Sequence, residues 1–227
     1  MTTLILVRHG RTPANREGIL AGWTPGVHLD EVGIVQAAKA AARLANLPIK
    51  AVVTSPLDRT VETAKAIIGD RDIPLENDER IGECHYGEWT GRPLSELAKE
   101  PMWKVVQSQP SAAVFPGDDG ESITQMAHRA IASVHHWNAH FGADGMYVMV
   151  SHGDVIKAIV SDALGAHLDL FQRVQIDPCS ISVIEYTPGR PFAIHINDTG
   201  SDLSRLIPKK KSRRARKGDA VVGGGAG

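Results

Sequence analysis

The sequence predicts an α/β protein, a three-layer helix–sheet–helix sandwich around a mostly parallel central sheet. Short apolar segments such as residues 4–7 and 146–150 indicate strands buried on both faces, as in parallel sheets that helices cover. These segments alternate with longer stretches whose apolar residues recur at helical spacing. At 227 residues the chain is long enough to bury the core of one large domain, which we expect to span residues 1–200.

The first strand is followed by a segment that favours loop structure. Residues 11–30 contain several breakers, namely Pro13, Gly18, Gly22, Pro25 and Gly26, which predict a long loop rather than a regular element. Asp30 then suits the N-cap of a helix that runs to about residue 46. The apolar face of this helix is expected to comprise Ile34, Ala37, Ala38, Ala41, Leu44 and Ala45.

A second strand is expected at residues 51–54, directly before another helix start. Ser55 suits the N-cap and Pro56 the first helical position, where the missing N–H of proline costs no hydrogen bond. Residues 78–92 show no regular period and predict an irregular segment. A helical stretch follows from Pro93, and the next proline is expected to interrupt it.

The second half of the chain predicts the remaining elements. Residues 121–141 carry apolar side chains at helical spacing and indicate a long helix. An apolar strand at residues 146–150 leads through a His-Gly pair into a helix over residues 155–164. Residues 181–187 and 192–197 read as two strands joined by a Pro-Gly turn.

Composition narrows the classes of function. No segment approaches the roughly 20 apolar residues of a membrane-spanning helix, so we expect no membrane partner. The two cysteines, Cys84 and Cys179, predict no disulfide framework, which favours a reducing, cytoplasmic location. Residues 209–217 hold 7 of the 25 basic residues, which leaves 18 basic against 25 acidic residues in 1–208.

We therefore expect residues 201–227 to form a basic, disordered tail on an acidic domain. Such a tail could bind nucleic acid or another polyanion, but it contains no aromatic residue for base stacking, so a solubilising role is favoured.

Polar residues follow three of the predicted strands. Arg8 and His9 end the first, Arg59 lies in the helix turn after the second, and His152 ends the strand at residues 146–150. Because ligands bind outside the carboxyl ends of strands in open α/β sheets, we expect these side chains to share one pocket. Guanidinium groups bind phosphate oxygens in pairs, and a histidine among them can act as a nucleophile. Glu83, in a loop that could reach the same edge, suits a general acid.

The motifs around these residues resemble those of the histidine phosphatase superfamily, which includes the cofactor-dependent phosphoglycerate mutases. The matching segments are Leu6-Val7-Arg8-His9-Gly10-x-Thr12-x-x-Asn15, Ala21-Gly22-Trp23, Thr54-Ser55-Pro56-Leu57-x-Arg59-x-x-x-Thr63-Ala64, Glu83-Cys84-His85-Tyr86-Gly87-x-Trp89-x-Gly91, Pro116-Gly117-x-x-Gly120-Glu121-Ser122 with Arg129, and Val150-Ser151-His152-Gly153. Their order and spacing agree over roughly residues 4–197. The sequence is most similar to actinobacterial members described as phosphatases or mutase-like. This resemblance implies a phosphoglycerate mutase-like fold.

The resemblance also implies a role for each residue. His9 would attack phosphorus and carry the phosphoryl group as phosphohistidine, while Glu83 would protonate the leaving alkoxide and then deprotonate the attacking water. The phosphoryl oxygens would be held by Arg8, Arg59 and His152, and the substrate-binding rim would comprise Asn15, Ala21, Gly22 and Gly153. No cofactor is implied, and the sequence has neither a Walker-type loop nor an Asp/Asn cluster placed for magnesium, so we expect no metal.

The fate of the phosphohistidine separates two enzyme classes. Mutases of this family hold a second anionic group with adjacent arginines in a long insertion after the acid segment, which is the motif at residues 83–91 that begins with Glu83. Residues 93–115 lack that insertion. Asp154 also stands where mutases usually have asparagine. We therefore predict a metal-independent phosphomonoester hydrolase that acts on a small phosphorylated metabolite. A phosphoglycerate mutase-type phosphotransferase is the alternative, and a polyanion-binding protein that uses the tail is the non-enzymatic one.

Several residues keep two interpretations at this stage. Arg11 departs from the family's usual Glu or Gln, and either adds positive charge at the pocket mouth or faces solvent. Asn15 suits a turn as well as a ligand. His136 and His140 have helical spacing for a metal pair, but no third ligand accompanies them. The tryptophans Trp23, Trp89 and Trp103 suit either a pocket wall or packing. Family members are often dimers, so the resemblance makes a homodimer a further expectation.

Overall fold

The structure is a computed structural model that describes residues 1–200 and Gly223, so the expected tail lies outside the described residues except for that glycine. One six-stranded sheet runs through it in the order β3-β2-β4-β1-β5-β6. The strands are β1 (Thr2–Arg8), β2 (Val52–Thr54), β3 (Leu75–Asn77), β4 (Met146–Ser151), β5 (Ile181–Tyr186) and β6 (Pro191–Asp198).

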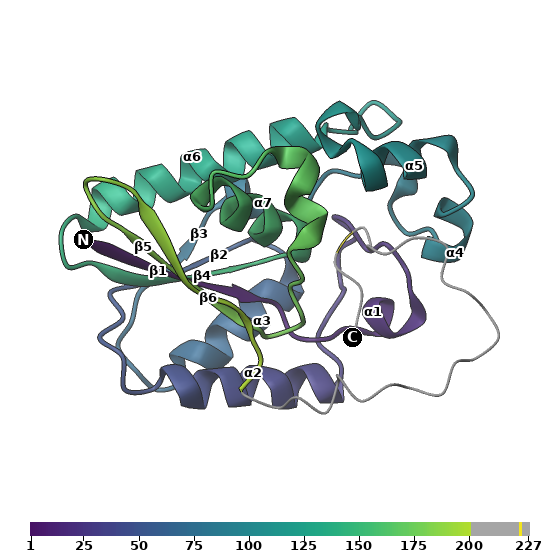
Figure 1. Ribbon diagram of the computed structural model, residues 1–227. Helices are drawn as coiled ribbons and strands as arrows, with labels where there is room; N and C mark the ends of the chain where they lie inside the picture. Colours follow the sequence, from purple (N-terminus) through teal and green to yellow (C-terminus); the bar gives the residue numbers. More distant parts are fainter. Residues whose placement is uncertain (201–222, 224–227) are drawn as a thin grey trace.

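Neighbouring strands from β3 to β1 pair in parallel, whereas β5 runs antiparallel to β1 and β6 antiparallel to β5. Helices cover both faces, with α6 and α7 above the sheet and α2 and α3 below it in Figure 1. The predicted helix–sheet–helix sandwich around a mostly parallel sheet is therefore confirmed.

The helices are α1 (Pro13–Glu17), α2 (Glu31–Leu44), α3 (Asp58–Ile68), α4 (Leu94–Leu97), α5 (Pro101–Ser108), α6 (Ile123–Phe141) and α7 (Gly153–Ala163). Short 3₁₀ helices lie at Glu79–Ile81, Gly87–Trp89, Pro110–Ala112 and Leu168–Arg173. In Figure 1 the segments around α1, α4 and α5 extend beyond the end of the sheet where β1 and β4 finish. Among the described residues, no helix is both long and apolar enough to cross a membrane.

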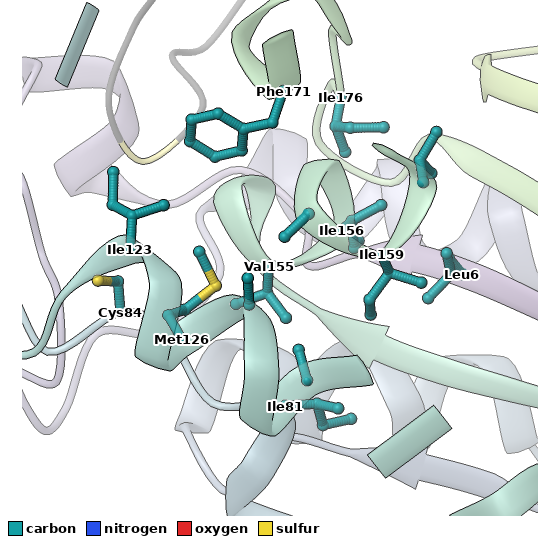
Figure 2. Close-up of a cluster of buried hydrophobic side chains, with 14 of the residues drawn as sticks. Leu6, Ile81, Cys84, Ile123, Met126, Val155, Ile156, Ile159, Phe171 and Ile176 are labelled. Atoms are coloured by element: carbon teal, nitrogen blue, oxygen red, sulfur yellow. The ribbon is translucent and has the colours of Figure 1, made fainter. Parts of the chain in front are cut away.

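The central strand β1 separates two apolar cores. Successive side chains of a strand point to opposite faces, and Leu4 and Leu6 enter the core under α6 and α7, whereas Ile5 and Val7 enter the core that includes α3 residues. Figure 2 shows the first core around Leu6, Met126, Ile156 and Phe171. Cys84, the residue that follows Glu83, packs in the same core and so fixes the backbone next to Glu83.

Two elements differ from the sequence prediction at their starts. Residues 11–30 are not wholly irregular, because Thr12 and Asn15 form a capping box that starts the short helix α1 at Pro13. Helix α3 begins at Asp58 rather than at Pro56, and its N-cap residue Leu57 makes no side-chain hydrogen bond. The prediction of Ser55 as the N-cap is wrong, because Leu57 is the N-cap residue, and the Ser55 hydroxyl lies 2.8 Å from His152 Nε2.

Helix α2 starts where predicted, and its buried face matches the prediction in part, because Ala37 and Leu44 are buried but Ile34 is not. The Asp30 carboxylate accepts a hydrogen bond from the Gly33 N–H at 2.8 Å, so the N-cap prediction is confirmed. Ile34 is 58% exposed, and the buried residues of this helix are Gly33, Ala37, Ala40 and Leu44. Close approach explains the difference, because a Cβ on Gly10 would lie 2.6 Å from the Gly33 carbonyl oxygen. Only small residues let the helix pack this tightly against the segment that leaves β1.

The segment before Glu83 is held by a buried carboxylate. Asp78 accepts hydrogen bonds from the Ser133 hydroxyl at 2.7 Å and the Trp137 indole N–H at 2.8 Å, both from α6, and from the Arg80 guanidinium. These donors lower the pKa of Asp78 far below its ordinary value despite burial, which by itself acts in the opposite direction. The acid segment is thereby fixed to α6.

Candidate active site

The strand register brings the predicted site residues to one edge of the sheet. Arg8 in β1 pairs with Ser151 in β4, and Thr54 in β2 pairs with Val150. Ladder-type hydrogen bonds continue one residue further, since the His9 N–H donates to the Ser151 carbonyl at 3.0 Å. Residues 8–9, 55 and 151–152 consequently lie side by side at the carboxyl ends of three strands, as the sequence predicts.

His9 has the geometry of a neutral imidazole with one nitrogen available. Its Nδ1 lies 2.7 Å from the Gly10 carbonyl oxygen, which can only accept, so Nδ1 carries the proton and Nε2 keeps its lone pair. Burial, followed by the charges of Arg59 and Arg8, lowers the pKa of His9 well below its ordinary value. The imidazole is therefore neutral, and Nε2 is nucleophilic, at neutral pH.

Two buried guanidinium groups supply positive charge beside His9. Arg59 donates to the Gly22 carbonyl at 2.9 Å, and Arg8 donates to the Ile176 carbonyl at 2.8 Å. Burial lowers the pKa of both guanidinium groups, and the Glu83 charge acts against this. Arginine nevertheless stays cationic in proteins, so the pair provides a fixed countercharge for an anion.

His152 follows β4, and its side chain contacts α3 and the segment between β2 and α3. Its Nδ1 lies 3.3 Å from Arg59 Nη2, which can only donate, and its Nε2 lies 2.8 Å from the Ser55 hydroxyl. This assigns the proton to Nε2 and makes His152 a neutral acceptor towards Arg59. Burial, followed by the Arg59 charge, lowers the pKa of His152 well below its ordinary value. The His9 and His152 ring centroids are 5.3 Å apart.

Glu83 completes the group as a buried carboxyl. Burial and then the charge of Asp154 raise its pKa to about 7, although Arg59 and the Cys84 N–H act in the opposite direction. Its Oε1 accepts from the Cys84 N–H at 3.0 Å. Glu83 Oε2 lies 3.7 Å from His152 Nδ1, but this contact is no ion pair at neutral pH because the imidazole is uncharged. A carboxyl with this pKa can deliver and retrieve a proton near neutrality.

The backbone carbonyl of Glu83 is hydrogen-bonded to two side chains that are distant in the sequence, one from α6 and one from the loop after α1. Its carbonyl accepts from the Trp23 indole N–H at 2.6 Å and from Arg129 of α6 at 2.8 Å. Arg129 also donates to the Gly82 carbonyl and forms an ion pair with Glu121. Trp23 thus packs on the acid segment, stacked on His85 with a centroid distance of 4.5 Å.

A pocket opens beside these groups. It is lined by His9, Thr12, Ala14, Asn15, Gly18, Ile19, Leu20, Ala21, Gly22, Arg59, Glu83, Leu94 and Gly223. Three predicted catalytic residues therefore line it, whereas Arg8 and His152 are fully buried behind its wall. Gly223, which lines the pocket, contacts both Arg8 and Asp154. Its carbonyl accepts a hydrogen bond from Arg8 at 3.3 Å, and its N–H donates to Asp154 at 2.8 Å.

The four predicted rim residues are placed differently. Asn15, Ala21 and Gly22 line the pocket, and Gly153 does not. Asn15 Oδ1 accepts from the Thr12 N–H at 3.1 Å in the capping box of α1, and the residue also lines the pocket, where its role as a ligand stays a prediction. Gly22 adopts φ = 52°, and a Cβ there would lie 2.9 Å from the Thr90 side chain. Gly153 is instead the buried first residue of α7.

Other residues with open interpretations take structural roles. Trp89 and Trp103 are core residues, and Arg11 pairs with Asp30 at 2.8 Å. His136 and His140 are exposed and pack edge-on against Trp137. In the part of the chain that the structure describes, no three His, Cys, Asp or Glu side chains gather as metal ligands.

Some side chains of the site are not predicted from the sequence. Ser55 and Tyr86 lie inside motifs that resemble those of the family, but neither is predicted as a site residue, and Lys157 carries no signal of its own. Tyr86 and Asp154 are buried and contact one another beside Glu83. In the sequence, Asp154 is distinguished only by its departure from the asparagine that is usual in the mutases.

Comparison with known proteins agrees with this geometry. The family pattern of the histidine phosphatase superfamily (branch 1) matches residues 4–199. A probable phosphoglycerate mutase (GpmB) of Yersinia pestis is 31% identical over 188 residues, which cover 82% of this chain and 86% of that protein.

Solved structures give the same result. YhfR of Bacillus stearothermophilus superposes with a TM-score of 0.80 at 28% identity, covering 87% of this chain and 98% of its own. A phosphoserine phosphatase of Entamoeba histolytica, in complex with 3-phosphoglyceric acid, gives 0.79 at 28% identity, covering 88% and 98%. The family predicted from the motifs is confirmed: this chain belongs to the histidine phosphatase superfamily and is an enzyme of that class.

Proposed function

We propose that the protein hydrolyses phosphomonoesters of small metabolites through a phosphohistidine formed on His9. The observation that carries this proposal is the His9 imidazole, whose Nδ1 is tied to the Gly10 carbonyl so that Nε2 keeps its lone pair, in a pocket that Arg59 and Glu83 also line. A loose phosphoryl transition state needs positioning and countercharge, and these groups supply both.

The first step forms an N–P bond and breaks the ester P–O bond. His9 Nε2 attacks phosphorus with its lone pair while the leaving alkoxide takes the proton of the Glu83 carboxyl. Arg59 and Arg8 balance the charge on the phosphoryl oxygens. Arg8 can do so only after Gly223 leaves its contact with the Arg8 guanidinium. With its proton on Nε2, His152 has no donor at Nδ1, so it can hold a phosphoryl oxygen only after Arg59 turns towards the phosphate and the proton is carried on Nδ1 instead.

The second step reverses the proton movement. Glu83, now ionised, takes a proton from water, and the hydroxide oxygen bonds to phosphorus as the N–P bond breaks. Inorganic phosphate leaves, and His9 and Glu83 return to their starting states. A single carboxyl performs both transfers because its pKa of about 7 makes both forms accessible near neutrality.

Water is favoured as the acceptor over a second phosphorylated metabolite. The segment after Glu83 folds as the short helices α4 and α5, and between Pro93 and Phe115 its only basic residues are Lys99 and Lys104. An adjacent arginine pair for a second anionic group is therefore missing from it. The relatives include both a probable mutase and a phosphoserine phosphatase, so assay of both reactions belongs to the test.

The test is phosphate release from 4-nitrophenyl phosphate and from phosphoserine in the presence of EDTA. We expect turnover by the wild type and loss of it in His9→Ala, because guanidinium groups rather than a metal supply the countercharge. His128→Ala, an exposed histidine on α6, is the matched control and should retain full activity. Activity that persists in His9→Ala would overturn the proposal.

Two other outcomes would replace it. Isomerisation of phosphoglycerate that depends on a bisphosphorylated primer and outruns phosphate release would establish a mutase. Tight polyanion binding that is lost on deleting residues 209–227, without turnover of any phosphomonoester, would establish a binding protein.

A further inference from the structure

A chain of buried polar side chains leads from Glu83 to helix α7. The Tyr86 hydroxyl oxygen lies 3.3 Å from Glu83 Oε1 and 3.1 Å from Asp154 Oδ2. The other oxygen of Asp154 accepts from the Lys157 ammonium at 3.1 Å. All four side chains are at most 5% exposed, so water does not screen the charges among them.

The number of available protons fixes the donor and the acceptor in each of these hydrogen bonds. A phenol has one proton, so Tyr86 can donate to only one of its two carboxyl neighbours. Asp154 is the nearer acceptor, and the Lys157 ammonium stabilises its negative charge. Burial, followed by the charges of Asp154 and Glu83, raises the pKa of Tyr86 well above its ordinary value, so the phenol keeps its proton. With that proton directed to Asp154, Tyr86 turns an oxygen lone pair towards Glu83.

We propose that Asp154, acting through the Tyr86 hydroxyl and balanced by Lys157, is a positioning residue that keeps the proton on the Glu83 carboxyl. This inference rests on the proposed function for the use of that proton, but the proton's retention is a property of the unliganded protein. Asp154 and Tyr86 need not touch substrate for this role.

The charges around Glu83 set the expected signs. Arg59 and Arg8 favour the ionised carboxylate, His152 and His9 are neutral, and the Cys84 thiol keeps its proton because burial raises its pKa. Asp154 is the negative group that opposes ionisation of Glu83. Removing the Asp154 charge should therefore release the Glu83 proton at lower pH, and removing the Lys157 charge should hold it to higher pH.

Carboxyl ¹³C NMR of the full-length protein monitors the titration of Glu83 directly. The Glu83 signal is identified by its absence from the spectrum of Glu83→Gln. We expect Asp154→Asn to lower the Glu83 pKa by about 1 pH unit and Lys157→Gln to raise it by a similar amount. Asp162→Asn, an exposed acid on the same helix, should leave it unchanged. An Asp154→Asn titration curve that matches the wild type would overturn the inference.

Tyr86→Phe tests whether the hydroxyl is the carrier. Loss of a hydroxyl that only adds polarity would leave Glu83 in a more apolar site and raise its pKa, whereas loss of the proposed acceptor should lower it. A rise would therefore overturn the role of Tyr86. This variant removes no charge, so it also serves where Lys157→Gln does not fold.

Enzyme kinetics separate this inference from the proposed function. The leaving alkoxide of phosphoserine needs a proton. In Asp154→Asn the alkaline fall of kcat/KM for phosphoserine should therefore shift to lower pH, by the same amount as the Glu83 pKa measured by NMR. The alkaline fall for 4-nitrophenyl phosphate, whose leaving group departs without a proton, should not move. Comparing variants cancels the ionisation of the substrate itself. An NMR shift without the kinetic shift would leave the Asp154 inference standing and refute Glu83 as the acid.

Discussion

Replacing Glu83 with glutamine should stabilise the folded protein at alkaline pH. Burial raises the pKa of this carboxyl to about 7 in the folded state, against an ordinary value of 4.5. The folded protein thus binds the Glu83 proton more tightly than the unfolded chain does. The stability that this provides is complete below pH 4.5 and is lost as the pH rises through 7.

The magnitude follows from the gap between the two pKa values. A difference of roughly 2.5 pH units corresponds to about 3 kcal/mol in the free energy of unfolding. Because Glu83 is only 4% exposed, little of this difference is lost to solvent screening. A glutamine of similar size cannot ionise, so we expect the advantage of Glu83→Gln over the wild type to be small near pH 5 and to reach about 3 kcal/mol at pH 9.

Urea unfolding followed by tryptophan fluorescence between pH 5 and pH 9 measures this difference. Glu88→Gln is the matched control, since Glu88 lies in the same segment but is exposed, and its difference from the wild type should not depend on pH. A Glu83→Gln difference that is constant over this range would refute the argument that Glu83 ionises at a cost in a buried site. The same variant should hydrolyse phosphoserine far more slowly, because its side chain carries no transferable proton.

Three further predictions concern neighbouring groups. Arg59→Lys should lower kcat/KM for phosphomonoesters about 100-fold, since an ammonium cannot replace a planar pair of donors, and an unchanged value would remove Arg59 from phosphate binding. Deleting residues 201–227 removes Gly223 from Arg8 and Asp154, so KM should fall by up to about tenfold; a KM that does not fall would show that Gly223 does not compete with substrate. Asp78→Ala should reduce the free energy of unfolding by about 1–3 kcal/mol, because it leaves the Ser133 and Trp137 donors unpaired, and a smaller loss in urea titrations would contradict this.

The architecture could be predicted because its signals are local and periodic. The apolar runs of β1 and β4 are typical of strands buried on both sides, and their parallel pairing places Arg8 and His152 at one edge. That convergence could be inferred from strand order alone, since carboxyl ends of parallel strands share an edge. The roles given to His9 and Glu83 remain proposals that rest on this geometry.

Other features depend on tertiary contacts that no local pattern encodes. Ser55 satisfies the rule for an N-cap, but its hydroxyl contacts His152, which follows the neighbouring strand β4, and α3 starts only at Asp58. Ile34 is the most apolar residue of its predicted face, but the close approach of Gly10 to Gly33 rotates α2 so that Ile34 is exposed. Hydrophobicity predicted that α2 is amphipathic, and the packing of small residues decided which side is buried.

The chain of contacts from Glu83 to Lys157 could not be predicted for a similar reason. Tyr86 and Asp154 are 68 positions apart and meet only after α7 packs on the sheet beside the acid segment. Each residue alone suits an ordinary core or helix position. Their meeting in a buried site gives Asp154 an influence on Glu83 that its place in the sequence does not indicate.

The central claim is that His9 Nε2 takes the phosphoryl group. It is tested most directly by mixing the wild-type enzyme with a phosphomonoester, quenching in alkali within a single turnover, and recording the ³¹P NMR spectrum of the protein. We predict an acid-labile phosphohistidine with phosphorus on Nε2 of His9, absent from His9→Ala and from wild type without substrate. Rapid phosphate release with no phosphohistidine at His9 at any time during the turnover would contradict it.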